Sequence, residues 1–183
     1  CYPCIFMSLF HTNTLLGASG SGGDPIYVDD VFSTFIYDGT GSTLAINNGI
    51  DLSGEGGMTW VKCRSDAADN RLIDTERGAH NILTPNNTTA NFNNSTIFSS
   101  FNSNGFSLAT DVASNGSGRT FCSWSFRKAR GFFDVVTWTG NGVDERLISH
   151  NLGSTPGMIM VKCTSHDENC LSISPPRFNS TQN

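Results

Sequence analysis

The chain has 183 residues, of which 37% are hydrophobic and 15% charged, and its formal net charge is −5 at pH 7. This length suits one domain or slightly more, and the acidic balance provides no electrostatic footprint for a nucleic acid. The sequence also contains no apolar run near the roughly 20 residues that a membrane-spanning helix needs.

The amino terminus divides at Met7. We expect residues 1–6 to lie upstream of the natural start, and residues 7–27 to form an extended arm that ends in a Gly/Ser linker. The arm has neither the basic start nor the long apolar stretch of a signal peptide. Its apolar side chains, the candidate docking residues, are Leu9, Phe10, Leu15 and Leu16.

Short apolar or alternating runs between Gly- and Asn-rich turns then predict strands in the middle of the chain. The first four predicted strands cover residues 31–37, 43–46, 57–63 and 71–74. The Asn/Thr-rich stretch 85–95 predicts an exposed loop. Beside it, Asp74, Glu76 and Arg77 suggest a surface ion pair rather than the two converging carboxylates of a glycosidase.

The second half of the sequence continues in the same style. Residues 97–108 predict two strands around Asn102–Gly105, which is a hairpin signal. Further strands are expected at residues 119–126, 132–138, 147–148 and 157–163, with the apolar run 132–138 buried on both faces. No segment predicts a helix longer than one turn, so the composition and the strand pattern together predict an all-β chain.

One segment occurs twice. Residues 51–65 (DLSGEGGMTWVKCRS) recur as residues 151–165 (NLGSTPGMIMVKCTS), an offset of 100, and residues 37–41 resemble residues 138–142 at an offset of 101. A repeat of this period indicates one structural unit used twice, and it suits a sandwich module better than a solenoid. The repeat is lost after Asn169, so the second copy is expected to be partial.

The chemistry-bearing residues form no recognisable catalytic or metal motif. Six cysteines are present, and Cys63 and Cys163 occupy equivalent positions of the repeat, which predicts small buried thiols. The four histidines do not have metal-ligand spacing. Asp111, Asp134 and Asp144 could meet as a calcium site, but we favour the interpretation as turn aspartates, because Asp commonly forms local hydrogen bonds in turns. We therefore expect no enzyme activity, no cofactor and no bound metal.

Three tryptophans remain as candidates for stacking on sugars, namely Trp60, Trp124 and Trp138. Each lies in a predicted strand, where aromatic side chains usually belong to the core. Both interpretations stay open from the sequence.

Several blocks in order carry a resemblance to a known group of proteins. They include MSLFHTNTLLGASGSGG, VDDVFSTFIYDGTGS, GGMTWVKCRS, SWSFRKARGFFDVVTWTGNG and ISHNLGSTPGMIMVKCTS. Together these blocks resemble virion structural proteins of marine tailed phages, notably those that infect cyanobacteria, from about Met7 to Ser165. The resemblance supplies no catalytic residues.

The resemblance implies an antiparallel β-sandwich of jelly-roll or concanavalin-like (laminin-G-like) type. With the repeat, we expect residues 28–139 to form a first β module and residues 140–183 to form the start of an incomplete second repeat with a tail. The implied function is that of a tail fibre, an appendage or its adaptor, located in the virion, assembled in the host cytoplasm, trimeric and bound to other tail proteins. It would dock through its N-terminal arm and contribute to host attachment. The alternative is a carbohydrate-binding module for host surface glycans.

Overall fold

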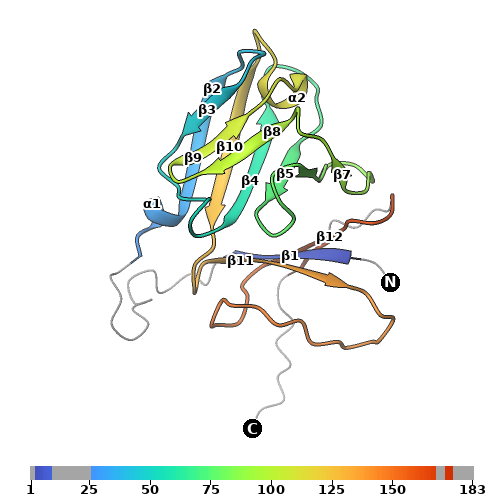
Figure 1. The fold of residues 1–183 in the computed structure, drawn as a ribbon. Coiled ribbons are helices and arrows are strands. Elements are labelled where there is room, and N and C mark those ends of the chain that lie inside the picture. The colour runs from blue at the N-terminus through green and yellow to red at the C-terminus, as the bar shows by residue number, and fades with distance from the viewer. Residues whose placement is uncertain (1–2, 10–25, 168–171, 175–183) are drawn as a thin grey trace.

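The computed structural model describes residues 3–9, 26–167 and 172–174 (Figure 1). It confirms an all-β chain, in which two four-residue helices are the exceptions within the described part. In chain order the elements are β1 (Pro3–Leu9), α1 (Val28–Val31), β2 (Phe32–Asp38), β3 (Leu44–Asn47), β4 (Gly57–Cys63), β5 (Arg71–Asp74), β6 (Asn81–Ile82), β7 (Phe92–Asn93), β8 (Phe98–Asn102), β9 (Gly105–Leu108), α2 (Val112–Asn115), β10 (Thr120–Arg127), β11 (Phe133–Thr139), β12 (Ile159–Cys163) and β13 (Ser172–Ser174).

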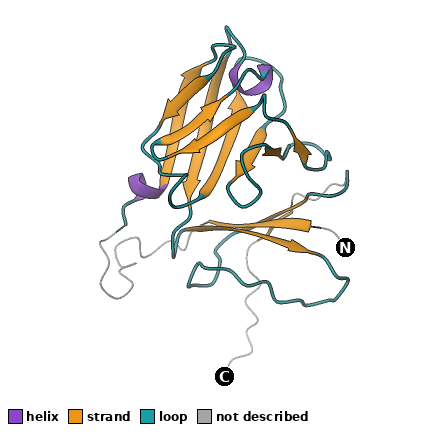
Figure 2. Cartoon of the chain, viewed as in Figure 1, coloured by secondary structure: helices purple, strands orange, loops and turns teal. Residues whose placement is uncertain are grey.

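Two antiparallel sheets face each other and form a sandwich (Figure 2). One sheet has the strand order β2-β10-β4-β5, and the other has the order β3-β9-β8. Alternate residues of the first sheet point into the space between the sheets, so Tyr37, Val61 and Phe121 all belong to one buried cluster. Phe98 and Phe106 of the second sheet stack in that cluster with ring centroids 5.5 Å apart. The predicted antiparallel β-sandwich is therefore confirmed.

Tyr37 is the one phenol in this core. Its hydroxyl donates a 2.8 Å hydrogen bond to the carbonyl oxygen of Ser114, and its ring stacks on Phe121 at 5.3 Å. Burial is the main reason that the pKa of Tyr37 lies well above its usual range. The unfolded chain therefore loses this proton at a lower pH than the folded chain does.

This difference predicts a loss of stability at alkaline pH. Above about pH 10 the unfolded state binds fewer protons than the folded state, so the free energy of unfolding falls by up to ~1.4 kcal/mol per pH unit. We expect Tyr37→Phe to remove this contribution while costing about 1 kcal/mol at neutral pH for the lost hydrogen bond. Denaturant unfolding between pH 8 and 11 measures both effects, with Tyr27→Phe, at a 60% exposed side chain, as the matched control. An unchanged alkaline slope in Tyr37→Phe would contradict the prediction.

A further sheet, β11-β1-β12-β13, lies across one end of the sandwich, with its strands running crosswise in Figure 1. A second apolar cluster joins the two bodies and includes Met58 and Phe126 of the sandwich and Phe133 and Met160 of the added sheet. The predicted loop 85–95 also contacts the added sheet, because Asn87 accepts a 2.9 Å hydrogen bond from the Nζ atom of Lys162. The added sheet is thus packed on the sandwich. Because β11 belongs to the added sheet, the second copy begins before the boundary expected between residues 139 and 140.

The added sheet repeats the geometry of the first. Strand β11 has the bounds of β2 shifted by 101 residues, and Cys63 and Cys163 end β4 and β12 with 1% and 3% exposure. Each of the two Sγ atoms lies 3.9 Å from the hydroxyl two residues later, at Ser65 and Ser165. The turn glycines Gly41 and Gly142 share left-handed φ values of 71° and 74°. The sequence repeat is therefore a structural repeat, as predicted.

Strand β1 takes the place in the second sheet that β10 takes in the first. Trp124 of β10 is opposite Thr34 and Trp60, and Met7 of β1 is opposite Val135 and Met160. These partners are related by the same offsets of 101 and 100 residues as the repeat itself. The two central strands therefore share their register against both neighbours.

The structure also corrects several sequence expectations. The strand predicted at residues 147–148 is wrong, because this stretch is coil and Leu147 is 94% exposed. Its counterpart in the first module, β3, pairs with β9, and within the described residues no strand follows β12 that could replace β9. The run 132–138 is buried on both faces only at its start, since Thr137 is exposed. Both short helices and the pair β6–β7 were not predicted.

Candidate functional site

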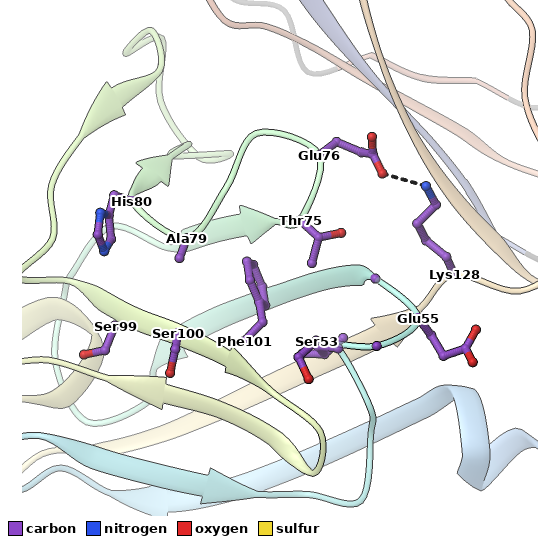
Figure 3. A pocket seen from close by; sticks show the side chains of 13 residues that line it. Ser53, Glu55, Thr75, Glu76, Ala79, His80, Ser99, Ser100, Phe101 and Lys128 are labelled. Carbon is purple, nitrogen blue, oxygen red and sulfur yellow. Dashed lines mark hydrogen bonds and ion pairs between the residues drawn. The ribbon is translucent and has the colours of Figure 1, made fainter.

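An open groove of about 670 Å³ lies beside the sandwich and is shown in Figure 3. The loop 52–56 before β4 forms one wall, and the turn 75–80 after β5 forms the other. Residues 99–101 of β8 and the side chain of Lys128 complete the lining. Segments far apart in the sequence meet here for two reasons. Strand β4 pairs with β5, and the β8–β9 hairpin belongs to the sheet that faces them.

Local hydrogen bonds fix the first wall. The backbone N–H of Gly54 donates to Oδ1 of Asp51 at 2.8 Å, and the N–H of Gly57 donates to the Thr75 hydroxyl at 2.9 Å. A side chain at position 57 would place its Cβ 2.1 Å from the carbonyl oxygen of Phe126, at a φ of 155°. Glycine is therefore required where the loop enters β4.

A buried ion pair fixes the second wall. The Nε atom of Arg77 donates to Oδ2 of Asp74 at 2.7 Å, and the two side chains are 8% and 0% exposed. Arg77 also donates to the carbonyl oxygen of Asn81 at 3.1 Å and to the side chain of Asn91. The sequence interpretation of a surface ion pair is thus wrong, because residues of β6 and of the following loop cover this turn.

Lys128 links the groove to the added sheet. Its Nζ atom lies 2.6 Å from Oε1 of Glu76 and 3.3 Å from Oδ1 of the buried Asp134 on β11. Partial burial lowers the pKa of Lys128, but the hydrogen bond to Glu76 and the nearby Asp134 outweigh this, so the net pKa is raised. The groove therefore keeps one cation between two carboxylates at neutral pH.

The remaining lining of the groove combines polar side chains with one phenyl ring. Phe101 is half-buried and packs against Phe98 with ring centroids 4.8 Å apart, and the side chains of Ser53, Ser99 and His80 also line the groove. Within the described residues, no group of three or more potential metal ligands occurs. The arrangement suits reversible binding of a polar molecule through hydrogen bonds and ring contact.

Two of the three candidate tryptophans come together. Trp60 and Trp124 are opposite each other on β4 and β10, with ring centroids 6.4 Å apart in an edge-to-face arrangement. Both are half-buried against the apolar cluster that joins the sandwich to the added sheet. Trp138 lies on β11, which belongs to the added sheet, whereas Trp60 and Trp124 belong to the sandwich. None of the three lines the groove.

The other candidate residues are placed as follows. Strand β1 runs across the division expected at Met7, and Leu9 is its last residue. Phe10, Leu15 and Leu16 lie outside the described residues, so docking by these side chains stays a prediction. Asp111 pairs with Arg71 at 3.4 Å, whereas Asp134 belongs to the Lys128 pair described above. Asp144 is exposed and accepts a 3.2 Å hydrogen bond from the backbone N–H of Glu145, so the three aspartates considered for calcium have separate partners.

Sequence reasoning missed the groove. Its lining residues come from four separate stretches and share no motif, and Phe101 read simply as part of a hairpin strand. The one signal in this region is that the loop 51–57 belongs to the repeated segment, and a repeat indicates a structural role rather than a binding site.

The fold and the groove define an antiparallel β-sandwich module with a partial second copy of its main sheet. The chain belongs to the family described as domain of unknown function DUF7483, whose model matches residues 28–174. No curated protein and no solved structure matches the chain. In the described part of the chain, no helix has the length and apolar character that crossing a membrane requires.

Proposed function

We propose that the chain is a structural module of a tailed-phage virion, part of a tail fibre or appendage or of its adaptor, with no enzyme activity. The observation that carries the proposal is the structural repeat. Strands β11, β12 and β13 occupy the same positions in their sheet that β2, β4 and β5 occupy in the first. A unit used repeatedly, with its second copy packed on the first, is how elongated assemblies are built. The resemblance of the sequence blocks to phage structural proteins supports the same class.

Composition adds to this proposal. Only 15% of the residues are charged, against a usual average of about 25%. Surfaces with few charges lose less solvation energy when they pack against further copies. The proposed partners are accordingly other tail proteins and further copies of this chain, with trimers as the expected symmetry.

Antibody labelling of virions tests this proposal. Gold-labelled antibodies raised against the purified chain should decorate the tail appendages of the phage whose genome encodes it. Antibodies against an unrelated capsid protein of that phage serve as the control for orientation. Virions without any label on the tail, together with detection of the chain only in infected-cell lysate, would refute a virion role.

The groove favours a second candidate, binding of host surface glycans. Sugars bind through hydrogen bonds to several hydroxyl groups and through contact with an aromatic face, and the groove presents Phe101 beside serine, glutamate and histidine side chains. This candidate is compatible with a role in an appendage, because attachment requires a receptor-binding surface.

For the glycan candidate we expect Phe101→Ala to weaken binding by about tenfold, which corresponds to about 1.4 kcal/mol for the lost contact between the ring and the sugar. A glycan array followed by calorimetry on the best ligand measures the change. Trp138→Ala is the control, because Trp138 lies outside the groove. Loss of binding in Trp138→Ala with full binding in Phe101→Ala would move the site to the tryptophan.

A further inference from the structure

Strand β1 occupies the position between β11 and β12, which we call the slot. In the first sheet the equivalent position, between β2 and β4, is filled by β10, which comes last of the four strands in the chain. In the second sheet it is filled by β1, which comes first. The slot strand of the second sheet is thus separated from its neighbours in sequence by the whole sandwich.

The register shows that the slot accepts a strand as β10 is accepted. Met7 meets Val135 and Met160, the repeat equivalents of the residues that meet Trp124. All seven residues of β1, Pro3–Leu9, are paired with β11, and five are paired with β12. Without a strand in this position, the facing edges of β11 and β12 would present unpaired backbone N–H and C=O groups, which is how a sheet recruits a further strand.

We propose that this slot also takes strand β1 of a second copy of the chain, so that copies join by strand exchange. Sixteen residues, 10–25, separate β1 from Ile26, and they can span at most roughly 58 Å. That reach allows β1 to enter the slot of a neighbouring copy. The strand ladder is the same within one chain and between two, so the backbone hydrogen bonds do not favour either arrangement.

Concentration decides between the two arrangements. A short tether gives β1 an effective concentration of the order of 1 mM at its own slot, so exchange becomes favourable when the local protein concentration approaches that value. Each chain carries one donor strand and one acceptor slot, and such head-to-tail contacts close into rings or continue as filaments. The proposal rests on the assembly role only for this high local concentration, because the slot geometry stands without it.

Cysteines in the ladder provide the test. Cys4 of β1 is opposite Cys163 of β12, and directly opposed residues of antiparallel strands have Cα atoms about 4.5–5.5 Å apart, within disulfide reach. Two full-length variants, Cys4→Ser and Cys163→Ser, are unfolded together, refolded at about 1 mM total chain and oxidised mildly. Neither variant can form this link alone, so a Cys4–Cys163 disulfide in the mixture, identified by peptide mass spectrometry, joins two chains.

We expect this interchain link in the mixture, none in either variant alone, and at least a tenfold lower yield after refolding at about 10 µM. Adding Met7→Pro to the donor chain should abolish the link, because proline inside a central strand removes a ladder hydrogen bond. An interchain link that survives Met7→Pro would overturn the proposal as random collision. An absent link in the mixture would also overturn the proposal. If the wild-type chain then forms the link within itself, β1 stays with its own chain. If the wild-type chain forms no such link, the pairing of β1 with β12, on which the proposal rests, is contradicted. Labelled virion tails together with an absent link would retain the proposed function and reject strand exchange.

Discussion

Arg77→Met is expected to destabilise the fold by about 3–5 kcal/mol, because it leaves the fully buried carboxylate of Asp74 without its counter-ion. Arg77 also donates to the carbonyl oxygen of Asn81 and to the side chain of Asn91, so the substitution leaves these acceptors unpaired as well. Equilibrium unfolding in urea measures the free energy directly.

The matched control is Arg119→Met, which removes an arginine from an ion pair at the surface. The Nη2 atom of Arg119 lies 2.7 Å from Oδ2 of Asp66, but the two side chains are 29% and 49% exposed. Such pairs contribute about 0–1 kcal/mol. Replacing both buried partners, as Asp74→Leu with Arg77→Met, should recover part of the loss, since no lone charge then remains. Equal losses in Arg77→Met and Arg119→Met would contradict the structure of this turn.

Phe121→Ala is expected to cost about 3–5 kcal/mol, through lost apolar burial and the cavity that it leaves. Phe121 is fully buried at the centre of the sandwich, stacks on Tyr37 and lies on β10, which is paired on both sides. The cost is high here because paired strands on both sides limit how far the core can relax around the missing ring.

Ile36→Ala provides the comparison for this substitution. Ile36 lies on the neighbouring strand β2, beside Tyr37 in sequence, but it points to the opposite face and is 62% exposed. We expect a change within about 0.5 kcal/mol. If thermal and urea unfolding gave Ile36→Ala the larger loss, the assignment of the two faces of β2 would be wrong.

Much of the sandwich could be predicted because its strands carry their own pattern. Strands β4 and β5 were predicted with their observed bounds, and the hairpin of β8 and β9 followed from the turn at residues 102–105. The equivalence of Cys63 and Cys163 predicted a shared buried environment, and both are buried. Short apolar or alternating runs bounded by turn residues suffice in these places, because such signals lie within the segment itself.

The rest depends on contacts between distant segments. The two-residue strands β6 and β7 are too short for any periodicity, and they exist because the chain around Arg77 folds back on β5. The groove arises where four separate stretches meet, so its residues share no spacing. Leu147 failed to form a strand because a strand needs a partner, and partners are not visible in the segment itself.

The mass of the full chain in solution, measured by light scattering over a concentration series, tests the central claim of an assembly module most directly. The account predicts a mass that rises from one chain, 19.7 kDa, to a defined multiple as the concentration approaches about 1 mM, with a trimer as the expected closed form. A mass of one chain throughout the series would contradict the assembly role and leave glycan binding as the function to pursue.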